Sequence, residues 1–364
     1  AIMSFFTFTY EIFYFPDRKV IIVVFSLLIF FLAYSFFADS FELARMSKIA
    51  MILLMPIPFV TMMISILYNI YLSLFVALYL VFFTFMMVEV DLQVVILTFS
   101  SALIGSFINL NVDRRSDFFK GGLILGLINS IIIISLSFIE NAPLKITIMH
   151  CQLAIANGIL NSILVLGIFP IYEHVFDITT KFKLLELSDL NADIFKKMLL
   201  NAPGTYNHSL LVSTLAEAAC KEIRGSYMLA RVGAFYHDIG KIPDAGVYIE
   251  NGITDMRAKK FSPREYSKLI ISHVDKGVSM AKASGLPESV IDFISEHHGT
   301  STMTYFYHQA LENASSSTDE LVDKNDFQYR GPKPRSKETA IVMLADAIEA
   351  ASRSIKDPTR DKIE

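Results

Sequence analysis

Five histidines and two aspartates in the C-terminal half of the chain have the side chains and the grouping that a metal centre requires. Two adjacent pairs and three single residues make up the set: His237-Asp238, His297-His298, His208, His273 and Asp346. Imidazole and carboxylate ligands suit first-row metals such as iron, manganese or zinc, and one carboxylate can bridge two ions. A single histidine is more often a structural residue, so the prediction of a two-metal site rests on the whole set.

Asp346 gives the clearest indication among the seven. Val342 lies four residues before it and Ala350 four residues after it, which places the carboxylate on the buried side of an alanine-rich helix. A buried carboxylate without a partner is strongly unfavourable, so a cation must lie close to it. Arg353 and a metal ion are both candidates for that cation.

Apolar residues at helical spacing predict the elements that hold these side chains. The predicted helices cover residues 189–200, 208–223, 228–237, 263–284, 287–298 and 336–355. No alternating strand pattern of useful length occurs, so this half is predicted to be all-α. Each candidate ligand then lies at a helix end or on an inward face. Adjacent residues on a helix point about 100° apart, so His237 and Asp238 can serve different positions around a cluster, with Asp238 as the bridging ligand.

Composition divides the chain into two halves of different character. Of the 364 residues 53% are hydrophobic and 19% charged, which is too apolar for a soluble two-domain protein. The excess lies almost entirely in six predicted membrane spans, at residues 20–37, 49–67, 71–90, 94–110, 118–139 and 148–172. Pro56 and Pro58 predict a broken or irregular second span. We therefore predict a polytopic transmembrane helical bundle over 1–176, a linker over 177–188 and an all-α domain over 189–364.

Positive residues in short loops indicate the cytoplasmic side of a membrane. Arg114 and Arg115 mark one such loop, and Lys181 and Lys183 mark another, which predicts a multi-pass protein of the plasma membrane with its C-terminal domain in the cytoplasm. With six spans, the loop that contains Arg45 would lie outside the cell, against this rule. One further crossing before residue 71 would place that loop on the cytoplasmic side.

Charge and cysteine content limit the ligands. A net charge of −4 without a Lys/Arg cluster argues against binding of a nucleic-acid polymer, so a small ligand is expected. Two cysteines, Cys151 and Cys220, offer no disulfide framework, which suits a reducing compartment. Residues 1–15 are apolar and are predicted to lie at the membrane interface. Because the chain starts without methionine and ends within a helical pattern, we expect a piece of a longer protein, truncated in its C-terminal domain.

The strings around the candidate ligands resemble the HD phosphohydrolase signature in its two-metal form. They are similar in particular to the cytoplasmic domain of the seven-transmembrane HD (7TM-HD) proteins, known as cyclic di-AMP phosphodiesterases. The strings are Asn201-Ala-Pro-Gly-Thr-Tyr-Asn-His208, Gly233-Ala-Phe-Tyr-His237-Asp238-Ile-Gly-Lys241, Glu296-His297-His298-Gly299-Thr300 and Leu344-Ala-Asp346-Ala-Ile-Glu-Ala-Ala-Ser-Arg353. The membrane half fits as well, although the family has seven spans after an extracellular domain and only six spans are readable here.

The resemblance implies two divalent transition-metal ions, iron or manganese, that share Asp238. His208, His237 and Asp346 would complete one ligand set, and His273, His297 and His298 the other. Activated water would attack phosphorus and open cyclic di-AMP to linear 5′-pApA.

The resemblance also assigns roles around the ligands. Asp238 and Lys241 are expected to be catalytic, with Lys241 also reaching a phosphate. Tyr329 is expected to stack on or hydrogen-bond the substrate, and Arg330 to contact phosphate. The expected partners are the cyclic dinucleotide, the lipid bilayer and a second copy in a homodimer.

Two other functions stay open. The chain could cleave cyclic di-GMP or another nucleotide, although the residues after His298 lack the Gly-Tyr-Pro element of the HD-GYP enzymes. It could also be a receptor whose HD fold only binds a nucleotide, although the presence of all seven expected ligands argues against that.

Overall fold

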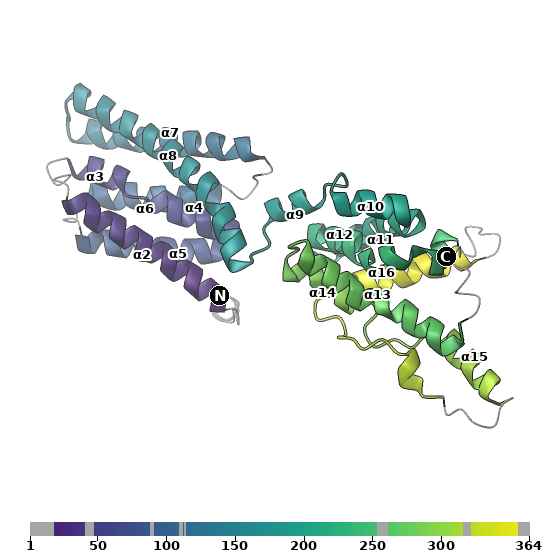
Figure 1. Ribbon diagram of the computed structural model, residues 1–364. Helices are drawn as coiled ribbons and strands as arrows, with labels where there is room; N and C mark the ends of the chain where they lie inside the picture. The colour runs from purple at the N-terminus through teal and green to yellow at the C-terminus, as the bar shows by residue number, and fades with distance from the viewer. Residues whose placement is uncertain are drawn as a thin grey trace. The chain divides into compact units, whose positions relative to one another are not determined.

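The computed structural model describes residues 18–40, 47–87, 91–108, 112, 114–252, 261–315 and 322–355. The chain forms two compact units, residues 1–180 and 181–364, and each is helical (Figure 1). Apart from one antiparallel bridge between Thr302 and Gln328, every regular element in these ranges is a helix, which confirms the all-α prediction. The predictions for residues 1–15, for Arg45 and for the chain after residue 355 lie outside the described residues.

Helices at all six predicted spans make up the first unit. They are α2 (Arg18–Ser40), α3 (Lys48–Leu54), α4 (Ile57–Leu67), α5 (Ile70–Met87), α6 (Leu92–Ile108), α7 (Arg115–Ile139) and α8 (Leu144–Phe176). Four stretches are long and apolar enough to cross a membrane: Lys19–Phe36, Lys48–Leu67, Arg115–Ile139 and Leu144–Phe176. Helices α5 and α6 are apolar but shorter. Apolar side chains such as Phe36 and Phe138 point outward, as in a bundle surrounded by lipid.

The second predicted span is broken at its prolines. Helix α3 ends at Leu54 and α4 begins at Ile57, because Pro56 has no amide hydrogen to continue the ladder. The backbone N–H of Phe59, one of the first in α4, donates instead to Oδ1 of Asn161 on α8 (3.1 Å). An amide side chain thus satisfies a donor that lipid could not satisfy.

Small residues bring α7 and α8 into close contact. Gly122 and Gly126 on α7 face Gly158 and Ser162 on α8, and a Cβ atom at Gly122 would lie 2.4 Å from the Gly158 carbonyl oxygen. Spacing of small residues by four is the usual means of packing membrane helices closely.

The second unit consists of eight α-helices and three short 3₁₀-helices in the described ranges. The α-helices are α9 (Lys181–Leu187), α10 (Asp193–Asn201), α11 (Pro203–Glu222), α12 (Tyr227–Tyr236), α13 (Pro263–Ala283), α14 (Glu288–Glu296), α15 (Thr304–Ser315) and α16 (Lys337–Ser354). The 3₁₀-helices are η2 (Ile239–Val247), η3 (Ile249–Asn251) and η5 (Lys324–Phe327). Of these, α9 lies in the stretch predicted as a linker, and α15 was not predicted.

Local sequence explains where the site helices begin. Ser262 and Glu265 form a capping box at the start of α13, and the Ser336 side chain caps α16. Helix α11 begins at Pro203, five residues before the predicted start. Proline is compatible with the first turn of a helix, where its missing N–H has no partner to lose. His208 therefore lies inside α11 and not at its first position.

Helix α12 forms the centre of the second unit and is fixed tightly against α14. The second unit has two clusters of buried apolar side chains, and α12 contributes to both: Val232 and Phe235 lie in one and Ala234 lies in the other. A Cβ atom at Gly233 would lie 2.3 Å from the Phe293 ring, so only glycine permits this approach. The close contact holds the C-terminal ends of α12 and α14 side by side, and both ends carry candidate ligands.

Candidate metal centre

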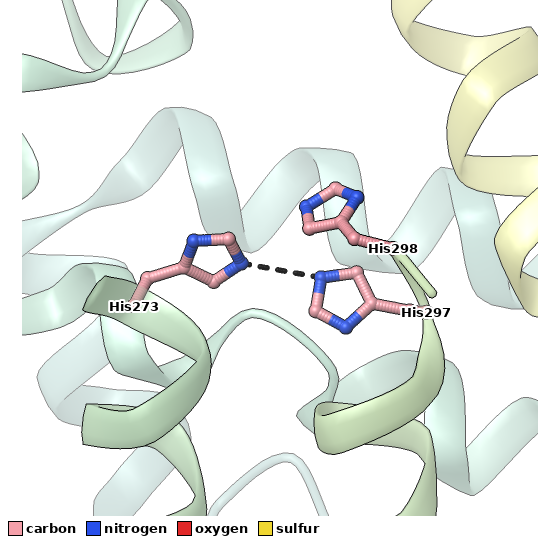
Figure 2. Close-up of side chains that lie close together, drawn as sticks. All are labelled: His273, His297 and His298. Carbon is pink, nitrogen blue, oxygen red and sulfur yellow. Dashed lines mark hydrogen bonds between the residues drawn. The ribbon is translucent and has the colours of Figure 1, made fainter. Parts of the chain in front are cut away.

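The structure brings all seven predicted ligands into one cluster. His208 comes from α11, His273 from α13 and Asp346 from α16; His237 and Asp238 follow α12, and His297 and His298 follow α14. His298 is partly exposed, whereas the other six are buried. The rings of His273, His297 and His298 converge on one point, as Figure 2 shows.

Asp238 lies between two groups of histidines. Its Oδ1 atom is 3.4 Å from His273 Nε2 and 3.7 Å from His297 Nε2. Its Oδ2 atom is 3.3 Å from His237 Nε2 and 3.6 Å from His208 Nε2. Each carboxylate oxygen therefore faces a different pair of imidazoles, which is the arrangement of a bridging ligand.

The potential ligand atoms form two outer groups and one central group. His208, His237 and Asp346 form one outer group, His273, His297 and His298 form the other, and His237, Asp238 and His297 lie between them; within each group the ligand atoms are within 4.8 Å of one another. Asp346 Oδ1 is 3.0 Å from His208 Nε2, and its Oδ2 is 3.7 Å from His298 Nδ1. These distances leave space for cations between the ligand atoms.

Backbone carbonyls fix the orientation of three imidazoles. Nδ1 of His237 lies 2.7 Å from the Ala234 oxygen, Nδ1 of His273 lies 2.7 Å from the Ile270 oxygen, and Nδ1 of His297 lies 2.9 Å from the Ile294 oxygen. A carbonyl oxygen can only accept, so Nδ1 carries the hydrogen in all three rings. In the neutral rings of His273 and His297, the Nε2 lone pair points into the cluster, whereas Asp238 and Asp346 act against burial and raise the pKa of His237. The Nε2 atoms of His273 and His297 are 3.2 Å apart, and two lone pairs at this distance call for a cation.

Burial and charge fix the protonation states of the cluster. Burial lowers the pKa of His273 to about 4 and that of His297 to about 3, so both imidazoles are neutral near pH 7. Burial also opposes the charged form of Asp238, but Lys241 and His237 outweigh it and hold its pKa well below the usual range. Neutral imidazoles around an ionised carboxylate are the forms that bind metal.

The cluster contains polar atoms without partners. Among the described residues, both carboxylate oxygens of Asp238 and the Nε2 atom of His237 are buried without a hydrogen bond. The Lys241 ammonium lies 2.7 Å from Asp238 Oδ2 as an ion pair, but it leaves Oδ1 unmatched. Unpaired buried groups of this kind are strongly unfavourable, and a metal ion would satisfy all of them together. The donor set therefore fits metal.

Comparison with known proteins gives the family. Residues 1–180 match the model of the 7TM receptor with intracellular HD hydrolase, and residues 205–351 match the HD domain model. The chain belongs to this 7TM-HD family. It is accordingly a membrane protein. Its histidine and aspartate cluster lies in an HD domain, HD domains are metal-dependent, and the side chains of this cluster could hold metal.

The chain is similar in sequence to two curated bacterial proteins. It is 39% identical over 255 residues to the cyclic-di-AMP phosphodiesterase PgpH of Bacillus subtilis, which covers 69% of this chain and 35% of that protein. It is 38% identical over 254 residues to PgpH of Listeria monocytogenes, with 69% and 35% covered. The chain thus spans about a third of the length of these curated relatives.

Solved structures of the L. monocytogenes PgpH HD domain are also similar. One is 40% identical and covers 48% of this chain and 79% of its own, with a TM-score of 0.44. The other, a complex with cyclic di-AMP, is 41% identical and covers 47% and 76%, with a TM-score of 0.43.

Three further residues singled out from the sequence lie around the HD cluster. Lys241 is partly buried between Asp238 and Glu250, 2.9 Å from Glu250 Oε1. Tyr329 is buried over His298, with ring centroids 4.2 Å apart. Arg330 is exposed and lines a cavity of about 360 Å³ that is also lined by His298 and Tyr329. Tyr329 therefore lies at the cluster, and Arg330 lies in the cavity next to it.

Arg353 does not pair with Asp346, which was the alternative to a metal. It contacts Glu349, which in turn lies 2.5 Å from His208 Nδ1. The Glu349 carboxylate oxygen can accept a hydrogen bond from Nδ1 of His208. The sequence reasoning missed Glu349, although it follows Asp346 by three residues and so shares its helix face.

Glu349→Gln should weaken metal binding roughly 10- to 100-fold, because it removes the charge that orients and polarises His208. A competition titration of the metal-free chain with a chromophoric chelator measures this affinity directly. Glu222→Gln, an exposed change at the end of α11, is the control. Equal affinities for the two variants would remove Glu349 from the metal centre.

Proposed function

We propose that this chain is a membrane-anchored, metal-dependent phosphodiesterase that hydrolyses cyclic di-AMP to 5′-pApA. The supporting observation is the position of Asp238, whose two buried oxygens face separate histidine groups. Its Oδ2 atom pairs with Lys241, and its Oδ1 atom has no hydrogen bond in the described residues. Two-metal sites of this kind act on phosphate esters. Two relatives bear the name cyclic-di-AMP phosphodiesterase, which supports the choice of substrate.

The proposed ligands fall into two sets joined at Asp238. His208, His237 and Asp346 would hold one ion with Asp238, and His273, His297 and His298 would hold the other. Histidine with carboxylate suits iron or manganese. When bound, such ions activate water near neutral pH and withdraw charge from the phosphate.

The remaining residues would bind and enclose the substrate. Lys241 is partly buried beside the cluster and keeps its charge because Asp238 and Glu250, against the effect of burial, raise its pKa. It would add positive charge next to the reacting phosphate. Tyr329 covers His298 and would exclude water from that side, and Arg330 would contact the second phosphate from the neighbouring cavity.

The proposed location follows from loop charges and helix lengths. Arg114 and Arg115 lie at the start of α7, and Lys181 begins α9, so we place both segments on the cytoplasmic side with the HD domain. The bundle would lie in the lipid bilayer of the cell membrane. Mass photometry of the purified chain would test for the proposed homodimer.

The proposed activity predicts metal-dependent cleavage with a base preference. The full chain in detergent, stripped with EDTA and reloaded with Mn²⁺ or Fe²⁺, should convert cyclic di-AMP to 5′-pApA and lose activity on stripping. We expect a higher kcat/KM for cyclic di-AMP than for cyclic di-GMP, because a pocket with polar groups left unpaired rejects the wrong base. Competitive assays followed by chromatography measure both rates. An equal or higher kcat/KM for cyclic di-GMP would favour the alternative that the chain is a cyclic di-GMP phosphodiesterase. Binding without turnover in the metal-loaded chain would favour the alternative that it is a receptor.

A further inference from the structure

A loop of the HD unit lies against the segment that carries the His297-His298 pair. The loop covers residues 328–336, between η5 and α16, and the segment covers residues 296–302. Near the start of the loop, the N–H of Tyr329 donates to the Ser301 carbonyl oxygen (2.9 Å). The 328–336 loop is therefore attached to the 296–302 segment at its first end.

The other end of the loop is attached by Arg335, which makes two contacts with Glu296. Its backbone N–H donates to Oε2 of Glu296 (2.9 Å), and its side-chain Nε lies 2.5 Å from Oε1. Only 1% of the Glu296 side chain is exposed, and a buried carboxylate is strongly unfavourable unless it is paired. Glu296 is the last residue of α14 and immediately precedes His297. The second attachment is thus a buried charged group next to a candidate metal ligand.

Between its two ends the loop packs closely on the segment. A Cβ atom at Gly299 would lie 3.5 Å from Pro334 Cδ, and one at Gly331 would lie 3.2 Å from Thr300 Cγ2. Both glycines have a positive φ, 52° and 82°, which other residues adopt only with strain. A loop that is attached at both ends and packed in between moves together with its neighbour. The position of the loop is therefore tied to that of the two histidines.

The loop carries two residues that the proposed function assigns to the substrate. Tyr329 lies over His298, and Arg330 is exposed and lines the cavity next to the cluster. Arg330 lies between the two attachments, so its distance from the candidate metal ligands depends on both of them. Glu296 does not line that cavity, and it can reach the substrate only through the loop.

We propose that Glu296 is a positioning residue for the phosphodiesterase reaction, because its bond to Arg335 fixes the 328–336 loop and holds Arg330 in place for the second phosphate of the substrate. This inference rests on the proposed phosphodiesterase function. A cyclic dinucleotide has one phosphate for the metal centre and another for Arg330. A diester with a single phosphate needs only the metal centre, so it should not depend on Glu296.

Glu296→Gln tests the attachment with two substrates. Glutamine keeps the size of the side chain but turns one accepting oxygen into a donor, which then faces an N–H of Arg335. We expect KM for cyclic di-AMP to rise about tenfold, the factor for loss of one hydrogen bond to a charged group, with kcat unchanged. The kcat/KM for methyl p-nitrophenyl phosphate, which has a single phosphate, and the metal content should stay as in the wild type.

Hydrogen–deuterium exchange measures the attachment without any assay of activity. Amides of the 328–336 loop should exchange faster in Glu296→Gln, because the loop then opens locally more often. Arg335→Gln should give the same increase in exchange and in KM. The side chain of Arg335 is 64% exposed, so this second variant is expected to fold even if the buried change at Glu296 does not. The double variant should be no worse than either single variant, since the two residues act as one unit.

Asp292→Asn is the matched control, because Asp292 contacts the same arginine at an exposed position, with 2.6 Å between Oδ1 and Nη2. Exposed ion pairs contribute little, so exchange in the loop and KM should not change.

Unchanged exchange in Glu296→Gln and Arg335→Gln would overturn the proposal, and so would faster exchange with an unchanged KM. An equal loss of kcat/KM on both substrates, or loss of metal, would place Glu296 at the metal centre and would also overturn it. A wild-type, metal-loaded chain that does not cleave cyclic di-AMP would overturn the proposed function itself.

Discussion

Asp238→Ala is expected to abolish hydrolysis of cyclic di-AMP and to reduce metal content at both sites together. Its two oxygens face the His237 and His208 pair on one side and the His273 and His297 pair on the other. Without this carboxylate each group loses a ligand, and the negative charge between the groups is lost as well. Elemental analysis of the purified variant, combined with the hydrolysis assay, measures both effects.

The control for this experiment is a second aspartate close by in the chain. Asp244 in η2 pairs with Lys276 at the surface (2.6 Å), and Asp244→Ala should retain metal and activity because surface ion pairs contribute little. Asp238→Asn keeps the shape of the side chain, so it separates loss of the ligand charge from misfolding. Near-normal rates with both metals present in Asp238→Ala would disprove the bridging role.

The second large effect expected is selective loss of one ion. His208→Ala should mainly empty the site formed with His237 and Asp346, whereas His297→Ala should mainly empty the site formed with His273 and His298. The ligand atoms of each outer group lie within 4.8 Å of one another, and Asp238 lies between the groups. Metal content and metal-specific spectroscopy of each variant would identify which site is empty.

His308→Ala provides the comparison, because His308 on α15 is exposed and lies outside the cluster. It should keep the metal content of the wild type. Identical metal loss in His208→Ala and His297→Ala would contradict the division into two sets and would indicate a single shared centre.

Features of the site that depend on local sequence could be predicted. His237-Asp238 and His297-His298 follow apolar helical runs, and these runs are the helices α12 and α14 of the structure. Pro56 gave the break between α3 and α4 in the same way. In each case the residue types themselves restrict the backbone, so no knowledge of the tertiary packing was needed.

Features that depend on packing between distant segments could not be predicted. Lys241 lies beside Glu250 because η3 folds back against α11, where a Cβ atom at Gly204 would lie 1.9 Å from the Glu250 carbonyl oxygen. Tyr248 follows an irregular 3₁₀ segment without helical periodicity, and only its contact with His273 places it at the cluster. Arg353, by contrast, pairs with Glu349 four residues before it on α16, a local contact that helical spacing alone indicates.

The hydrogens on Nδ1 of His237 and His297 have a consequence for the backbone. Ala234 and Ile294 lie in the last turns of α12 and α14, where carbonyl groups have no partner of their own within the helix. These candidate ligand histidines therefore also cap the C-terminal ends of the helices that precede them. Ring position and helix end are mechanically one unit, so an ion that holds the rings also fixes the points from which the two following loops depart. One of the following segments, η2, carries Lys241, and the other leads to the bridge at Thr302.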